Sequence, residues 1–280
     1  MDGVFYINKP KGMTSFDVVA KLRKQIHQKS IGHTGTLDPN AEGLLIVLVG
    51  KACKALPYCN HDQKEYIAQL SFGKKTTTGD RWGDVVEERK VTAISREALE
   101  SVLQSFIGES FQQPPMTSAI KVNGKKLLEY QREGKVVQVK PRKIRIDHLT
   151  CLAFDGFSAT IKAIVTQGTY IRVLCEDIAE KTGNIGTMTE LCRTMIGPIS
   201  LDQAEKIEDI TEKSTPHPIT EILQGTLPMF ESDKINEIKQ GKRLFLNSTE
   251  ELVLLTHQNE VVAAYEKVEG NEYRCRRGLW

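Results

Sequence analysis

Three segments of the chain have apolar residues spaced as in an amphipathic helix. The first follows a hydroxyl residue, Thr14 or Ser15, that can cap it. Its apolar face is predicted to carry Phe16, Val19, Leu22 and Ile26. The same reasoning predicts a helix after the cap residue Ser95 and another after the turn at Gly168. The predicted helices span residues 14–27, 95–106 and 170–181.

Other segments have the pattern of strands. Residues 43–50 contain an unbroken aliphatic run, Leu44 to Val49, which is typical of a strand buried on both faces. Residues 64–72 alternate apolar with polar, and residues 157–166 form a third predicted strand. Strands and helices mix without strict alternation, so the pattern favours an α+β fold with a mixed sheet over a doubly wound parallel sheet.

Two changes in composition suggest how the chain is organised. Residues 112–139 begin with Pro114-Pro115 and contain Asn123-Gly124, as expected of an exposed insertion. After about Gly225 only short strand-like runs remain, at residues 252–255 and 260–265. The sequence therefore predicts a main domain over residues 1–224, with the insertion at about 112–139, and a small β-rich domain over residues 225–280.

Composition narrows the class of protein. The 280 residues are 40% hydrophobic and 26% charged, as in a soluble globular protein. The longest aliphatic run, Leu44 to Val49, falls far short of the ~20 residues that span a bilayer. The start of the chain lacks the pattern of a signal peptide, and the six cysteines form no CxxC pair. We expect a cytoplasmic protein with reduced cysteines, no membrane segment and no metal site.

Charge is unevenly distributed although the net charge is only +2. Residues 112–146 contain nine Lys or Arg and two Glu, whereas residues 200–240 contain nine acidic and four basic residues. A solvated surface often has such a bias, so the basic segment alone is weak evidence for a nucleic-acid partner.

The densest chemical signal is the glycine-rich segment at residues 32–39, GHTGTLDP. Its glycines permit unusual backbone angles and close approach of a ligand, and Pro39 stiffens the loop directly after Asp38. One interpretation is a turn in which Asp38 bonds to its own backbone, and the other is a carboxylate presented on a rigid loop. A P-loop is excluded, because Leu45 and Ala52 occupy positions where that motif needs glycine and a hydroxyl residue.

The chain resembles the bacterial tRNA pseudouridine-55 synthases, the TruB-type pseudouridine synthase family. The resemblance extends over roughly residues 4–200, and its specific segments are GHTGTLDP and Gly168-Thr169-Tyr170-Ile171-Arg172. The matching segments come in the family's order and are residues 8–15, 32–39, 64–66, 73–83, 114–124, 168–172 and 191–193.

The resemblance implies a fold and a reaction. The fold would be a mixed, mainly antiparallel sheet flanked by helices, with an inserted RNA-binding loop region and a C-terminal PUA-like domain. The reaction would isomerise one uridine in the T loop of tRNA to pseudouridine, by base flipping and without cofactor or metal. Asp38 matches the catalytic aspartate, and Arg172 matches the arginine that pairs with it. Tyr66 matches the tyrosine that lies against the target base, where its hydroxyl could assist proton removal.

The resemblance also implies residues that bind the substrate, a tRNA T stem-loop, in a protein expected to be a monomer. His33 would fill the space that the flipped base leaves, and Lys9 would support the active-site loops or a phosphate. Leu191 would line the pocket, and Asp80 would have a polar role there. Further RNA contacts are expected from Lys121, Arg132 and Arg193, with Lys125 and Lys126.

Two departures from the family pattern affect the insertion and the loop around Asp80. Thr117 stands where the family often has an aromatic residue, and Thr76-Thr77-Thr78 replaces the usual Thr-Asp-Thr.

The sequence leaves two alternative functions open. One is an RNA-binding helper of tRNA folding with secondary catalysis, and the other is a synthase of the same fold that acts on another RNA.

Overall fold

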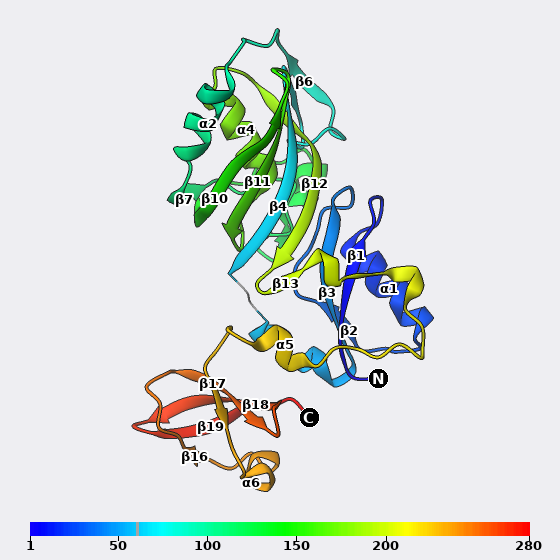
Figure 1. The fold of residues 1–280 in the computed structure, drawn as a ribbon, viewed down its shortest axis with the longest axis vertical. Coiled ribbons are helices and arrows are strands. Elements are labelled where there is room, and N and C mark those ends of the chain that lie inside the picture. The colour runs from blue at the N-terminus through cyan, green and yellow to red at the C-terminus, as the bar shows by residue number, and fades with distance from the viewer. Residues whose placement is uncertain (60–61) are drawn as a thin grey trace. The chain divides into compact units, whose positions relative to one another are not determined.

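The structure is a computed structural model that describes residues 1–59 and 62–280. The chain forms two compact units (Figure 1). Residues 1–61 and 195–280 make up the terminal unit, and residues 62–194 make up the central unit. The chain passes between the units a second time inside strand β12 (Gly186–Ile196). Strands and helices follow one another without strict alternation, which confirms the predicted α+β class.

The terminal unit is built on two strands that are buried on both faces. β1 (Gly3–Lys9) pairs antiparallel with β3 (Glu42–Val49), so the strand predicted at residues 43–50 is confirmed. β2 (Ile31–His33) pairs antiparallel with β3, and β14 (Glu205–Lys206) pairs parallel with β1. Alternate residues of β1 and β3 face two separate apolar clusters, which explains the unbroken aliphatic run.

Helix α1 (Ser15–Gln25) packs on one of these faces. Its first turn is held by a capping box, in which the Thr14 side chain accepts from Asp17 N and the Asp17 carboxylate accepts from Thr14 N. The predicted apolar face was wrong at Phe16, which is 63% exposed. Ser15 occupies the buried position instead, and Phe16 lies about 100° further around the helix.

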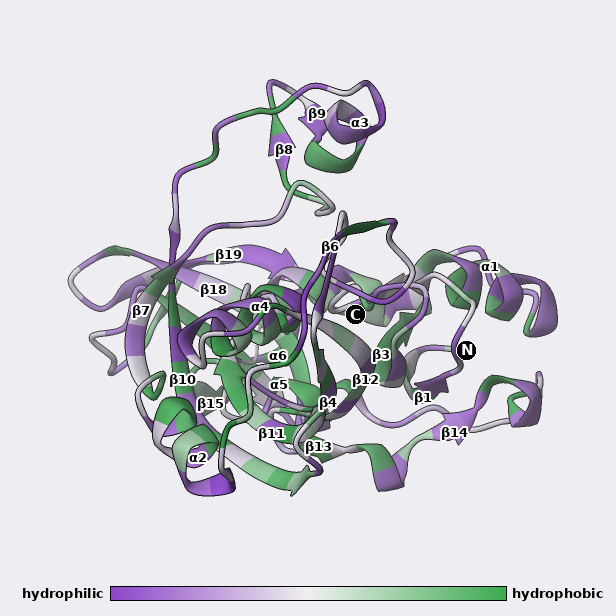
Figure 2. Ribbon diagram, turned by 90° about the horizontal axis from the view of Figure 1, so that it is seen from above, coloured by the Kyte–Doolittle hydropathy of each residue, from purple (hydrophilic) through white to green (hydrophobic). Residues whose placement is uncertain are grey.

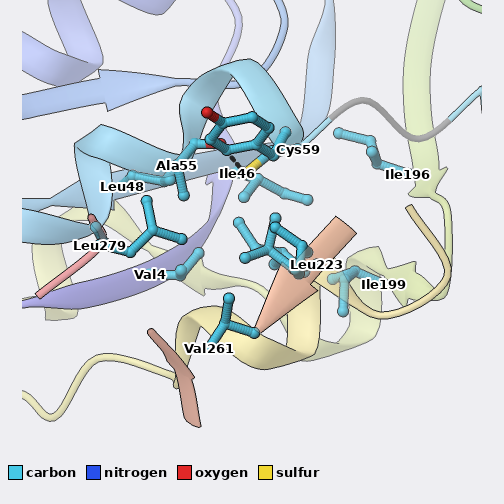
Figure 3. Packing of buried hydrophobic residues seen from close by; sticks show 14 of the residues in the cluster. Val4, Ile46, Leu48, Ala55, Cys59, Ile196, Ile199, Leu223, Val261 and Leu279 are labelled. Carbon is cyan, nitrogen blue, oxygen red and sulfur yellow. Dashed lines mark hydrogen bonds between the residues drawn. The ribbon is translucent and has the colours of Figure 1, made fainter. Parts of the chain in front are cut away.

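The C-terminal part of the terminal unit contains a five-stranded sheet in the order β15 (Met229–Glu231), β17 (Leu252–His257), β18 (Glu260–Glu269), β19 (Glu272–Gly278) and β16 (Leu244–Phe245). One face of this sheet encloses its own apolar core, which includes Tyr265 and Tyr273. Residues of the other face join the cluster beneath β1 and β3 (Figure 3). This sheet therefore shares a core with the N-terminal strands.

The central unit is an antiparallel sheet covered by two helices (Figure 1). β4 (Gln63–Phe72), β11 (Ser158–Thr166), β10 (Arg142–Phe154) and β7 (Gly108–Gln112) follow one another across it. The helices are α2 (Arg96–Gln104), capped by the Ser95 hydroxyl, and α4 (Ile171–Lys181). They cover the buried positions of β4 and β10, so the predicted strands and helices of this region are confirmed.

The predicted insertion stands off from the rest of the central unit (Figure 2). It contains β8 (Lys121–Val122), β9 (Lys125–Lys126) and α3 (Leu127–Arg132). Asn123 and Gly124 both have positive φ, as the tight turn of a two-residue hairpin requires. The Tyr130 hydroxyl donates to the Val122 carbonyl at 3.2 Å, which joins α3 to the hairpin.

Shorter elements complete the chain. In the central unit, β5 pairs with β6 as a small hairpin. The terminal unit contains a 3-10 helix, η1, after β3, and a few short turns and strands before the C-terminal sheet. These elements are β5 (Lys74–Thr76), β6 (Val85–Glu88), η1 (Gly50–Tyr58), β13 (Ile199–Ser200), η2 (Leu201–Gln203), η3 (Ile207–Asp209), α5 (Ile219–Leu223) and α6 (Ile235–Lys239).

Candidate active site

The loop that carries Asp38 follows β2, and hydrogen bonds from the side chains of Ser15 and Lys9 hold its backbone in place. The Ser15 hydroxyl accepts from Leu37 N at 2.9 Å and donates to Leu37 O at 3.3 Å. Leu37 is itself buried, and Ala41 N donates to Asp38 O at 3.1 Å. The backbone on both sides of Asp38 is therefore fixed, and its half-buried carboxylate stands on a rigid loop.

Lys9 is the second of these supports. It is fully buried, and its Nζ donates to the carbonyl oxygens of Pro39 at 3.1 Å, Met13 at 2.7 Å and Pro10 at 2.9 Å. A buried ammonium needs such acceptors, because burial without them costs several kcal/mol. Lys9 was expected either to support the active-site loops or to bind a phosphate, and these contacts favour support of the loops. His33 ends β2 at the start of the same loop and is half-buried.

Tyr66 lies in the central unit, in the middle of β4, opposite Ala163 of β11. It is buried, as the alternating pattern predicted. Leu191 and Arg193 occupy buried positions on β12, the neighbouring strand of β4. Burial and the positive charge of Arg193 lower the pKa of Lys64, two residues before Tyr66, to about 8.

Arg172 is in the first turn of α4 and is buried. Its Nη1 donates to the Thr78 carbonyl at 2.8 Å and to the Thr117 hydroxyl, and its Nη2 donates to the Thr117 carbonyl at 3.2 Å. Its Nε lies 4.0 Å from Oδ2 of Asp80. The guanidinium thus links the turn around Asp80 to the start of the insertion.

The Asp80 turn, residues 76–84, is fixed by its own hydroxyl groups. Thr76 Oγ1 donates to the Asp80 carbonyl at 2.7 Å, and Thr78 Oγ1 donates to the Asp80 carboxylate at 2.7 Å. A Cβ on Gly83 would clash with the Thr77 and Thr78 hydroxyls, so the turn needs glycine there. Of the departures from the family pattern, Thr77 accepts from Asp84 N and so helps to close the Asp80 turn, and Thr117 accepts from Arg172. Sequence reasoning missed this role.

The residues predicted for the site are divided between the two units. The terminal unit brings together Lys9 and the Asp38 loop, and the central unit brings together Arg172 and Asp80. The pairing of Asp38 with Arg172 stays a prediction. In the insertion, Lys121 and Arg132 are exposed.

Within residues 1–59 and 62–280, none of the helices has the length and apolar character needed to cross a membrane. Within the same ranges, nowhere do three His, Cys, Asp or Glu side chains gather as a metal ion would need.

Comparison with known proteins identifies relatives along the whole chain. A family model described as TruB family pseudouridylate synthase (N terminal domain) matches residues 23–171. The tRNA pseudouridine synthase B of Mesoplasma florum is 34% identical over 278 residues, which cover 99% of this chain and 97% of that protein. The protein of the same name from Oenococcus oeni is 39% identical over 285 residues, which cover 96% of this chain and 95% of that protein.

Solved structures show the same fold. An H/ACA RNP bound to a substrate RNA containing 2′-deoxyuridine aligns with a TM-score of 0.76 and 21% identity. A Cbf5-Nop10-Gar1 complex aligns with the same score and 22% identity. Each alignment covers 99% of this chain and 85% of the other. The expected pseudouridine synthase fold, with a mixed sheet and a β-rich C-terminal sheet of PUA type, is confirmed. The chain belongs to the TruB family of pseudouridylate synthases.

Proposed function

We propose that this protein converts one uridine in the T loop of tRNA to pseudouridine, with Asp38 as the catalytic carboxylate. The observation that carries the proposal is the rigid loop of the family motif, in which Ser15 and Lys9 fix the backbone beside Asp38. A catalytic group must be held close to its productive position, since a shift of about 1 Å can cost ~100-fold in rate.

The reaction is an isomerisation that balances without any cofactor. The bond from N1 of uracil to C1′ of ribose breaks, and a bond from C5 to C1′ forms. The proton on C5 leaves to solvent, and N1 takes up a proton. We assign to Asp38 the attack or proton transfer that starts this exchange, and to Arg172 the orientation of its carboxylate. Tyr66 stacks on the uracil, and its hydroxyl assists the removal of the C5 proton.

The target uridine lies inside a folded RNA loop, so it must leave the stack before it reacts. Flipping a base costs a few kcal/mol, which contacts in the pocket offset. We assign the vacated space to His33, the wall of the pocket to Leu191, and polar contacts to Asp80 and Arg193. The loops that carry them are supported by Lys9.

The rest of the RNA is held by charge and by the C-terminal sheet. Phosphate contacts from the exposed Lys121 and Arg132 fit the position of the insertion, which stands off from the central unit. We assign residues 1–224 to catalysis and residues 225–280 to a PUA-like RNA-binding domain, consistent with the separate apolar core around Tyr265. The protein acts as a monomer in the cytoplasm.

Tritium release tests the proposal directly. Uridine labelled at C5 should lose its label when unmodified tRNA is mixed with the protein, and tRNA without the target uridine should release none. Asp38→Ala should abolish release and still bind tRNA, whereas Asp38→Glu tests whether position or charge is limiting. Absence of release at enzyme excess would reject the enzymatic function and leave a folding helper. An active Asp38→Ala protein would show that another carboxylate is catalytic.

A further inference from the structure

The Asp80 turn presents an aromatic side chain to solvent. Trp82 is 43% exposed, although most of the tryptophans in folded proteins are largely buried. Its backbone N–H donates to the Asp80 carboxylate at 3.1 Å, and that same carboxylate lies 4.0 Å from Nε of Arg172. Trp82 is thus fixed, through one carboxylate, to a proposed active-site arginine.

The indole ring is supported from one side by a charged neighbour. The Arg81 guanidinium lies over the ring at 5.0 Å from its centre. Nη1 of Arg81 in turn donates to the Glu190 carboxylate at 2.8 Å, and Glu190 directly precedes Leu191 on β12. The Arg81 N–H donates to the carbonyl of Met188, which also belongs to β12. The arginine and the ring are therefore held together against a strand of the main sheet.

The turn beneath the ring is rigid. Gly83 N donates to the Asp80 carbonyl at 3.2 Å, and Asp84 N donates to the Thr77 hydroxyl at 3.1 Å. These bonds, with those of Thr76 and Thr78, leave the backbone of Trp82 little freedom. An aromatic ring that is already immobilised loses little conformational entropy when it binds a second flat group.

We propose that Trp82, backed by Arg81, is a stacking subsite for an unpaired nucleobase of the bound RNA. This inference rests on the proposed function, because it places that base beside the residues assigned to the flipped uridine. Arg81 covers one face of the indole, and the base stacks on the exposed remainder. The guanidinium strengthens the stack and adds a positive charge for the neighbouring phosphate. Stacking of this kind tolerates any base, so the subsite contributes affinity more than sequence choice.

Kinetics can separate this role from a structural one. Trp82→Ala should raise KM for tRNA about tenfold, which corresponds to ~1.4 kcal/mol of lost stacking, and should leave kcat within about twofold. Trp82→Phe should restore most of the affinity, since a phenyl ring also stacks. Phe157→Ala is the matched control, because Phe157 is an exposed aromatic residue (69%) in the turn between β10 and β11 and has no assigned role in RNA binding. Its KM should not change.

Fluorescence gives a second readout. The chain has two tryptophans, Trp82 and Trp280, so Trp280→Phe leaves Trp82 as the single reporter. A T stem-loop hairpin should quench Trp82 emission at saturation, and a fully paired RNA duplex of equal length should not. Unquenched emission with an unchanged KM in Trp82→Ala would overturn the subsite, and would point to a protein contact on exposed Trp82, Val85 and Val86 instead. Tritium release by the wild-type protein in the same assays distinguishes this failure from failure of the proposed function.

Discussion

Nε of Arg172 lies 4.0 Å from Oδ2 of Asp80, and both side chains are largely shielded from water. The buried guanidinium gains a negative neighbour from a turn that precedes it by about 90 residues in the chain. Opposite charges in such a shielded place interact more strongly than at the surface, and their geometry orients whatever else the arginine contacts.

Loss of the charge on Asp80 should therefore disturb Arg172. Asp80→Asn retains the size of the side chain and can keep the bonds to Thr78 and the Trp82 N–H. We expect kcat for tritium release to fall by roughly 10- to 100-fold through misplacement of the arginine. Affinity for tRNA should fall less than kcat, because asparagine can still make the polar contact assigned to Asp80. Asp84→Asn, in the same turn but exposed, is the control, and an equal loss there would show that the turn's net charge, not the Arg172 contact, matters.

The Thr117 hydroxyl is expected to contribute through the same arginine. Thr117→Val keeps the shape of the side chain and removes an acceptor of Arg172 Nη1. A buried donor left without its acceptor costs ~1–3 kcal/mol, so urea unfolding should show a loss of that size together with a lower kcat. Thr117→Ser keeps the hydroxyl and should behave almost as the wild type. Equal stability of the Val and Ser variants would show that this hydrogen bond does not stabilise the protein.

Some of this organisation could be read from sequence, and some could not. The strand at 43–50 and the capped helix at 14–27 follow from local pattern, and the Asp38 loop follows from a motif. Contacts of Arg172 with Thr117 could not be predicted, because residues 55 positions apart meet only through packing of the whole unit. Phe16 was misplaced because the period of a helix does not reveal how wide its covered face is.

The shared core of the terminal unit is another feature that the sequence did not reveal. The apolar run 252–255 alternates between two cores, one of them formed with β1 and β3. The composition change near Gly225 suggests a separable domain, but composition carries no information on what the domain packs against. Leu254 and Leu223 are both fully buried and belong to the same cluster as Val4 and Ile46. Figure 3 shows Leu223 of this cluster together with Val4 and Ile46.

Truncation after residue 224 should consequently damage folding as well as RNA binding. It would expose the apolar residues of β1 and β3 that face this cluster, and we expect an aggregating protein. Leu254→Ala should lower the free energy of unfolding by ~2–5 kcal/mol. Phe245→Ala, at a residue that is 78% exposed, should change it by less than about 0.5 kcal/mol. A truncated protein that unfolds cooperatively with unchanged stability would contradict the shared core.

Lys64 should make stability depend on pH. Its pKa in the folded protein is about 8, below the ordinary value of 10.5, because burial and Arg193 disfavour the charged form. Between these two values the unfolded chain binds more protons than the folded one, so this group's contribution to stability rises with pH across that window. Below pH 8 the full cost of the buried charge is present. Lys64→Met should thus stabilise the protein by ~1–2 kcal/mol at pH 7 and by less above pH 10.5. A pH-independent difference in urea unfolding would refute this origin.

The exposed basic residues of the insertion should act on affinity through salt. Each phosphate contact releases condensed counterions, so the slope of log Kd against log salt should flatten by roughly 0.7–0.9 for each contact removed. Lys121→Ala and Arg132→Ala should show this change and keep kcat at saturating tRNA, because neither residue touches the reacting base in the proposed arrangement. Lys213→Ala provides the control, since Lys213 is an exposed lysine of the terminal unit in the acidic stretch 200–240. A slope that changes equally in all three variants would mean that overall charge, and not the insertion, attracts the RNA.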